Sequence, residues 1–442
     1  MRLKKQLLAI GILLAFLLIP SGAFAGGGIA IQLNGSDMSF TDAAPINQNG
    51  RVYVPFRVVF EGMDANVDYA KATRTITAKK GNTVVQFTVG NANIKVNGQV
   101  VKTDAPSFIR NSRTYVPVRF AAQSLRIQVG WDQKAQTVVM VDKALWESKI
   151  PSDYKTMDGL MEFFREQKAQ NLEVNGNMNL DMKLVVEGKK GVKQAPVTGS
   201  FDVTGSTKGN LSNLDIKGSM DMDAYQKALK EAGKLRDEDV NTAKVMKNFQ
   251  MKVIENLDRD KVYLKSPVFA LSDLNPNVWY QMDQGEAAME EGFGMSALMK
   301  AADYDSFEAF VRSELNNLQL EDANYCKGFL NAVEGYRDSR FTDKDGNKRA
   351  VITKDDDETV ILTLKTAGDR VAGYEEQTIT YMKGMPVSTV TVSGDASAES
   401  VNMTMNVAGM MSVNFSSNLN YTEGKTAPMA LPPSGEKVVV LK

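Results

Sequence analysis

The sequence predicts an α+β protein in which a small duplicated α+β module at the N-terminus precedes a large antiparallel sheet with covering helices. Three observations support this fold class. A heptapeptide recurs at an offset of 62 residues, which indicates an internal duplication. Beyond residue 170, long stretches alternate apolar with polar residues, as strands with one buried face do. A helical stretch over residues 285–338 separates two sets of such strands.

The composition excludes several function classes. The chain has 442 residues, of which 43% are hydrophobic and 24% charged, which is an ordinary globular composition with enough apolar material for two domains. It contains no histidine, which excludes Ser-His-Asp and Cys-His hydrolases and every His-ligated zinc, copper or non-heme iron site. We therefore expect no cofactor and no metal. The net charge of -1 argues against nucleic acid as a partner.

The first 25 residues have the pattern of a secretory signal peptide. Residues 1–5 carry three positive charges, residues 7–19 are apolar apart from Gly11, and the small-x-small ending at Ala25 suits signal peptidase. We predict cleavage after Ala25 and a secreted protein associated with the cell envelope. An uncleaved anchor is the alternative, but the apolar run is shorter than the roughly 20 residues of a spanning helix.

The repeated heptapeptide defines two copies of one unit, at about residues 29–80 and 92–143. Residues 51–57 read RVYVPFR and residues 113–119 read RTYVPVR. Each copy begins with a strand that turns at Asn-Gly, a dipeptide that adopts the positive φ angles of a tight hairpin. The proline of each heptapeptide ends a short strand, because it lacks an N–H donor, and starts a short helix. A final hairpin closes each copy, which we expect to be one structural unit.

The doubled motif, with Trp131 and Asp132 following the second copy, resembles the copper amine oxidase N-terminal-like domain, also called a stalk domain. The resemblance covers about residues 29–143. It implies a small α+β surface module of exported proteins from Gram-positive bacteria. It implies no oxidase activity here, since amine oxidase catalysis needs histidine-bound copper and this chain has no histidine.

The motif residues are the candidate surface residues of this module, and two interpretations are open. In one, the aromatic side chains fill the module core and each arginine packs along it and binds a carbonyl or carboxylate. In the other, these side chains form a surface that contacts a ligand. The residues concerned are Tyr53, Arg57, Tyr115, Arg119 and Trp131.

Charge is distributed unevenly along the chain. Residues 26–146 contain 14 Lys and Arg against 8 Asp and Glu, whereas residues 147–442 contain 35 against 45. A basic module joined to an acidic domain could attach to an anionic cell-wall polymer or to lipid headgroups. A solvated basic face without a partner is the alternative.

The second part of the chain follows a predicted linker at residues 144–156. A helix with Met157, Leu160 and Phe164 on one face comes first. Strands are expected at 175–187, 197–204 and 210–222, then a helix at 223–233 and strands at 249–256, 261–265 and 278–282. After three helical stretches within 285–338, strands return at 350–353, 359–366, 373–382, 387–394, 400–407 and 411–421, with a short last strand at 437–441.

This order of elements, with the Val278-Trp279-Tyr280 strand and the ending at residues 430–433, resembles the LolA/LppX-like lipoprotein carriers. The resemblance covers about residues 157–442. It implies a half-barrel in which a curved sheet encloses an apolar cavity under covering helices. The ligand that it implies is an acyl chain or another lipid-like molecule.

Methionine usage points in the same direction, because 19 of the 23 methionines follow residue 150. Thioether side chains adapt to ligands of variable shape, although they also fill irregular cores. Glycines weaken the helical pattern around residues 289–299, which therefore suits a mobile lid. The candidate cavity or lid residues are Met289, Phe293, Met295, Leu298 and Met299.

These observations predict a non-enzymatic envelope protein with a surface-attachment module and a ligand-binding half-barrel. A structural or protein-interaction module with a filled core is the alternative, and a hydrolase acting through two carboxylates is a third class. Cys326 is the sole cysteine and lies at helical spacing among apolar residues, so we expect a buried, unreactive thiol. The sequence predicts no oligomeric state.

Overall fold

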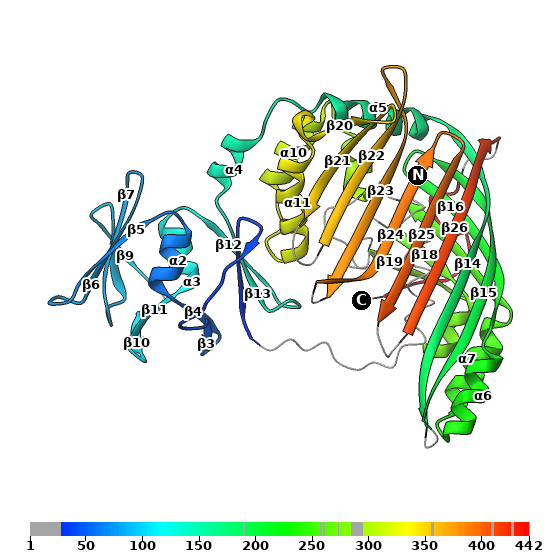
Figure 1. Cartoon of the computed structure of the whole chain (residues 1–442), viewed down its shortest axis with the longest axis horizontal. Coiled ribbons are helices and arrows are strands. Elements are labelled where there is room, and N and C mark those ends of the chain that lie inside the picture. The colour runs from blue at the N-terminus through cyan, green and yellow to red at the C-terminus, as the bar shows by residue number, and fades with distance from the viewer. Residues whose placement is uncertain are drawn as a thin grey trace.

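The computed structural model describes residues 28–103, 105–188, 191–256, 259, 261–272, 274–283, 295–354, 358–382, 384–407, 411–425 and 428–441. A small N-terminal module lies beside one large curved sheet that carries helices (Figure 1). The α+β fold class predicted from the sequence is confirmed. The predicted signal peptide at 1–25 and the residues Met289 and Phe293 lie outside the described residues.

The N-terminal module contains three small sheets and two short helices. One sheet has the order β12-β13-β1-β2, the second β10-β11-β4-β3 and the third β5-β6-β7-β8-β9. The strands are β1 (Ala30–Leu33), β2 (Ser36–Asp37), β3 (Ile46–Gln48), β4 (Arg51–Pro55), β5 (Asn66–Ala70), β6 (Thr75–Lys80), β7 (Thr83–Thr88), β8 (Asn93–Val96), β9 (Gln99–Lys102), β10 (Phe108–Arg110), β11 (Arg113–Pro117), β12 (Gln128–Asp132) and β13 (Thr137–Val141). The helices are α2 (Phe56–Gly62) and α3 (Val118–Ser124), each directly after a proline as predicted.

The two sequence copies are not separate units, which corrects the expectation drawn from the repeat. The first strand of copy one, β1, pairs in parallel with the last strand of copy two, β13. The last hairpin of copy one, β5-β6, continues through β7 into the first hairpin of copy two. The heptapeptide strands β4 and β11 pair antiparallel, with Val54 opposite Val116. Each of the three sheets therefore contains strands from both copies. One short hairpin alone buries too little apolar area to be stable.

The predicted linker is partly helical and packed, which also differs from expectation. Helix α4 (Lys143–Lys149) begins where β13 ends. Trp146, Ile150 and Tyr154 recur every four residues and are buried in the core of the large domain. Apolar residues at that spacing lie on one side of a helical path and pack together. The connection between the two parts of the molecule is therefore part of the core.

The large domain is built on one 14-stranded sheet, antiparallel except where the last strand, β27, pairs in parallel with β19. Its order is β20-β21-β22-β23-β24-β25-β26-β14-β15-β16-β17-β18-β19-β27. The strands are β14 (Asn171–Gly188), β15 (Gly191–Lys208), β16 (Leu211–Asp221), β17 (Phe249–Asn256), β18 (Lys261–Lys265), β19 (Trp279–Asp283), β20 (Thr342–Lys344), β21 (Asn347–Lys354), β22 (Glu358–Ala367), β23 (Arg370–Met382), β24 (Met385–Asp395), β25 (Ala398–Val407), β26 (Met411–Glu423) and β27 (Val438–Val440).

Helices cover the inner face of this curved sheet (Figure 1). They are α5 (Lys155–Ala169), α6 (Asp223–Ala232), α7 (Asp237–Met246), α9 (Met295–Ala301), α10 (Phe307–Asn316) and α11 (Ala323–Gly335), with short 3-10 helices at Pro267–Ser272 and Asp338–Arg340. The sequence did not predict α7, which has only two fully buried residues, Ala243 and Met246. Among the described residues, none of the helices has both the length and the apolar content needed to cross a membrane.

Inward-facing glycines, among them Gly205 and Gly218, lie where neighbouring strands of the sheet approach closely. A Cβ on Gly205 would lie 2.0 Å from the carbonyl oxygen of Asn213, and one on Gly218 would lie 2.2 Å from that of Ser200. Only a residue without a side chain permits such an approach, and glycine kinks of this kind curl a sheet. Glycines in β15 and β16 therefore permit a close approach of neighbouring strands.

Candidate functional site

The motif tyrosines lie in the core of the N-terminal module. Tyr53 and Tyr115 pack against Phe108, with ring centroids 4.9 and 5.6 Å away. The Tyr115 hydroxyl donates a hydrogen bond to the carbonyl of Ala44 at 3.1 Å. Both tyrosines are buried, at 5% and 6% exposure. They occupy the positions that the packing interpretation requires.

The motif arginines lie at the surface, in the first turns of α2 and α3. Both Arg57 and Arg119 are exposed. Arg57 Nη1 donates to Glu61 at 3.0 Å and its guanidinium lies 5.6 Å from the Phe56 ring centroid. Trp131 is half-buried and its indole N–H donates to Gln133 at 3.0 Å. The arginines and Trp131 thus reach solvent, whereas the tyrosines do not.

Further basic side chains are exposed on the same module, and several lie on strands at its outer end. They include Lys71, Arg74, Lys79, Lys95, Lys102, Arg110, Arg126 and Lys134. We call these residues, with Arg57 and Arg119, the basic surface. Arg57 is paired with Glu61, and all of these side chains are exposed to solvent.

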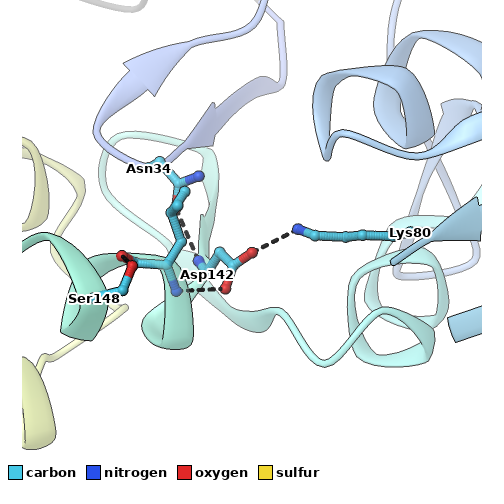
Figure 2. A network of polar contacts seen from close by, with 5 residues as sticks. Asn34, Lys80, Asp142 and Ser148 are labelled. Carbon is cyan, nitrogen blue, oxygen red and sulfur yellow. Dashed lines mark hydrogen bonds and ion pairs between the residues drawn. The ribbon is translucent and has the colours of Figure 1, made fainter. Parts of the chain in front are cut away.

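Asp142 joins the module to the large domain. Its Oδ1 accepts from the backbone N–H of Leu145 and caps α4, while its Oδ2 accepts from Lys80 Nζ at 2.5 Å. Asn34 Oδ1 in turn accepts from the backbone N–H of Asp142 at 2.8 Å. Figure 2 shows this network, in which the carboxylate of Asp142 connects β6 to α4 and its backbone N–H connects to the N-terminal hairpin.

A second contact docks the module against α11. Asp132 Oδ2 accepts from the backbone N–H of Ala323 at 3.0 Å, which satisfies an unpaired donor at the helix start. Gly130 lies so close to Leu320 that an added Cβ would be 2.4 Å from the Leu320 carbonyl oxygen. Docking therefore depends on a glycine and an aspartate that the sequence analysis did not select as functional.

Both copies contact α11, since a Cβ on Gly35 of the first copy would lie 3.4 Å from Leu330, but it is the second copy whose last strand enters the core of the large domain. Every residue of β13 is buried, and Val139 and Val141 belong to the core of the large domain. The equivalent residues of the first copy, Thr77 and Lys79, are polar and at least partly exposed. This difference is visible in the sequence, because β13 is continuously apolar whereas β6 alternates apolar with polar residues.

Methionines gather on the inner face of the large sheet. Strands β14, β16, β17 and β25 and helices α5, α7 and α9 all contribute to one buried core. Its methionines include Met157, Met161, Met178, Met182, Met220, Met222, Met246, Met251, Met299 and Met403. Phe201 and Phe249 pack edge to face among them, with centroids 5.1 Å apart.

The described lid residues lie in this core rather than over an open cavity. Leu298 and Met299 on α9 are 1% and 2% exposed, whereas the Met295 side chain is outside the described part of the structure. The segment after α9 is fixed to α5, because Arg165 donates to the carbonyls of Ala302 and Tyr304 at 3.3 and 3.2 Å. Leu298 and Met299 of α9 are thus part of the buried core.

Acidic side chains are also buried on the inner face of the large sheet. Glu376 and Glu399 are buried among apolar side chains, and Glu399 accepts from the Tyr421 hydroxyl at 3.1 Å. No group of three or more Asp, Glu and Cys residues among those described could hold a metal ion. Cys326 is fully buried, and burial raises the pKa of its thiol to about 12.

Comparisons with known proteins address both parts of the chain. Residues 32–140 match the model of the copper amine oxidase N-terminal domain. No curated protein matches the chain. A DUF1329 family protein from Desulfovibrio piger is 9% identical, with a TM-score of 0.18, over 62% of this chain and 92% of that structure. A putative outer membrane lipoprotein-sorting protein domain from Vibrio parahaemolyticus is 9% identical, with a TM-score of 0.17, over 59% and 89%.

The N-terminal resemblance drawn from the repeated heptapeptide is confirmed by the family match. The likeness of the chain to a lipoprotein-sorting domain is distant. These comparisons show that residues 32–140 of the chain match the copper amine oxidase N-terminal domain family.

Proposed function

We propose that the chain is a secreted, non-enzymatic protein of the cell envelope whose large domain binds an acyl chain or a similar apolar ligand. The basic surface attaches it to an anionic wall polymer or to lipid headgroups. The family match at residues 32–140 supports a place outside the cytoplasm. The observation that carries the ligand proposal is the methionine-rich inner face under a short helix.

Ligand entry requires α9 to leave that face. The helix has seven residues, and its end is tied to α5 through Arg165 and through Lys168, which pairs with Asp303. A helix of this length has little intrinsic stability, so packing of Leu298 and Met299 holds it in place. We expect α9 to turn about its anchored end, so that Leu298 and Met299 leave the inner face. An acyl chain then takes their place and keeps the apolar face covered. Unbranched methionines can then repack around the chain.

The first test is binding of cis-parinaric acid, followed by fluorescence, together with lipid extraction and native mass spectrometry of protein from its own host. Leu298→Ala and Met299→Ala shorten the side chains that compete with the ligand, so we expect tighter binding and a lower melting temperature that the ligand restores. Leu330→Ala is the matched control, because it truncates the same core on α11. It should lower the melting temperature and leave affinity unchanged.

No bound lipid and no ligand-induced rise in melting temperature would contradict the proposal. The filled core would then support the alternative, a structural or protein-interaction module.

Attachment is tested separately, by sedimentation with isolated cell walls and with vesicles containing anionic lipid. The double variant Arg57→Glu and Arg119→Glu reverses two charges of the basic surface. We expect it to bind less, and binding of the unmodified chain to fall as salt rises. Lys183→Glu, an exposed charge reversal on β14, is the control. An equal loss of binding in the Lys183→Glu variant would mean that the basic surface has no specific role in attachment.

A further inference from the structure

The outer face of the large sheet carries a feature that the lipid proposal does not use. Residues 428–437 run across β16–β19 before the chain ends in β27, and we call this segment the strap. Asn213 holds one end through both backbone groups of Met429, and Asn256 Nδ2 donates to the carbonyl of Ala430 at 2.8 Å. Glu436 holds the other end, where it accepts from Lys265 and from the Trp279 indole N–H at 2.8 Å.

A cleft of about 430 Å³ lies between the strap and the strands. Its floor includes Ile254 and Trp279, which form a small apolar cluster with Tyr263, separate from the core of the inner face. Gln250 and Lys252 alternate with the core residues of β17 and are exposed, so both face outward along the cleft. The cleft is therefore distinct from the methionine-rich interior.

The charges in the cleft balance. Lys252 and Lys265 stand against Asp215 and Glu436. The Asn213 amide is bonded to Met429, and the Ser266 hydroxyl is bonded to the Gln250 carbonyl and the Val268 N–H, so the polar side chains that face the cleft for a ligand are those of Gln250 and Lys252. A site for a phosphate or a carboxylate carries an excess of positive charge, and this lining carries none. A site for a long acyl chain is an enclosed apolar cavity, whereas Gln250 and Lys252 line this cleft at the surface.

An extended peptide fits less well than a compact ligand. Peptides that add to a sheet use an open strand edge, and β27 already occupies the edge of β19. The remaining walls are apolar C–H surfaces from Met429 and from prolines, among them Pro267 and Pro433. Hydrogen-bond donors and acceptors beside such apolar surfaces suit a ring that has hydroxyl groups around its rim and C–H groups on its faces.

We propose that this cleft binds a saccharide unit of an uncharged, polyhydroxylated glycan, with Gln250 and Lys252 as hydrogen-bonding residues. The test is isothermal titration of the full mature chain with chitotriose, cellotriose and maltotriose, with inorganic phosphate as the anionic probe. Trp279 lies in the floor, so its fluorescence should change on binding and the change should be absent in Trp279→Phe.

We expect Gln250→Ala and Lys252→Ala each to weaken binding of the active trisaccharide about 3- to 10-fold, the loss of one hydrogen bond. Lys183→Ala, on the outer face of β14 away from the cleft, should bind as the unmodified chain does. Binding of none of the three sugars, binding of phosphate alone, or equal affinity of all variants would each overturn the proposal. Lipid binding at the inner face is measured on the same variants and should be unaffected, so the two proposals fail independently.

Discussion

Asp142 shows how one side chain couples two parts of the molecule. It caps α4 and holds Lys80, so its loss leaves a backbone N–H and an ammonium without their acceptor. We predict that Asp142→Ala lowers the free energy of unfolding by about 2 kcal/mol. Urea denaturation followed by the fluorescence of buried Trp146 measures this.

The matched variants separate the two roles of Asp142. Asp142→Asn keeps an oxygen for the Leu145 N–H and should lose less stability than the alanine variant, while Lys80→Met removes only the ion pair. Equal stability of Asp142→Ala and the unmodified chain would show that the network of Figure 2 contributes nothing.

Cys326 illustrates a residue whose role the sequence predicted and the structure explains. Its thiol is buried and donates to the carbonyl of Gln319 at 3.1 Å, and burial raises its pKa to about 12. Because the thiolate is the reactive form, we predict that DTNB does not label the native protein at pH 8 and labels it fully in urea. Rapid labelling under native conditions would mean that α11 opens readily.

At the scale of elements, glycines in β15 and β16 let neighbouring strands approach closely. Gly218→Ala would force a Cβ against the carbonyl of Ser200. We predict a loss of about 2 kcal/mol or more in the free energy of unfolding, comparable to overpacking a core. Ser219→Ala, the next residue and exposed on the outer face, should change stability by less than about 0.5 kcal/mol. Chemical denaturation of the two variants gives the comparison.

The strap should respond to acid through Glu436. Its pKa lies below the ordinary value of 4.5 because Lys265 hydrogen-bonds to its carboxylate, with a further contribution from the Trp279 N–H. A carboxyl whose pKa is lowered by folding stabilises the native state above its unfolded pKa, and this contribution disappears as the pH falls through the lowered value. We therefore predict that Trp279 fluorescence changes below about pH 4.5.

Two variants identify the origin of that acid transition. Glu436→Gln cannot titrate, so its fluorescence should stay constant over the same pH range. Trp279→Phe should lack the signal. An unchanged transition in both would assign it to another group and another tryptophan.

At the scale of the whole molecule, β13 links two cores: Val138 and Met140 belong to the core of the module, and Val139 and Val141 to the core of the large domain. We predict a single cooperative transition in calorimetry of the unmodified chain. Gly130→Val prevents the close approach to Leu320 and should split this into two transitions. Asp68→Val, at the equivalent position of the first copy, is the control and should keep one. Two transitions in the unmodified chain would show that the parts unfold independently.

Local patterns in the amino-acid sequence predicted most of the long elements. Alternation of apolar and polar residues predicted the long strands from β14 to β26, and the prolines at 55 and 117 predicted where α2 and α3 begin. These features follow from the neighbours along the chain, since side-chain period and the missing N–H of proline are local properties. Where the apolar pattern was weak, as in α7, the prediction missed the helix.

The partners of the elements were decided only by tertiary structure. The exchange of hairpins between the two copies, the docking of β13 and the path of the strap all join residues distant in sequence. A hairpin has the same local pattern whichever copy it completes, so the pattern cannot specify its partner. The number of methionines was visible in the sequence. That Leu298 and Met299 pack against them in one core was not. Local chemistry fixes which faces must be buried, and three-dimensional packing decides what buries them.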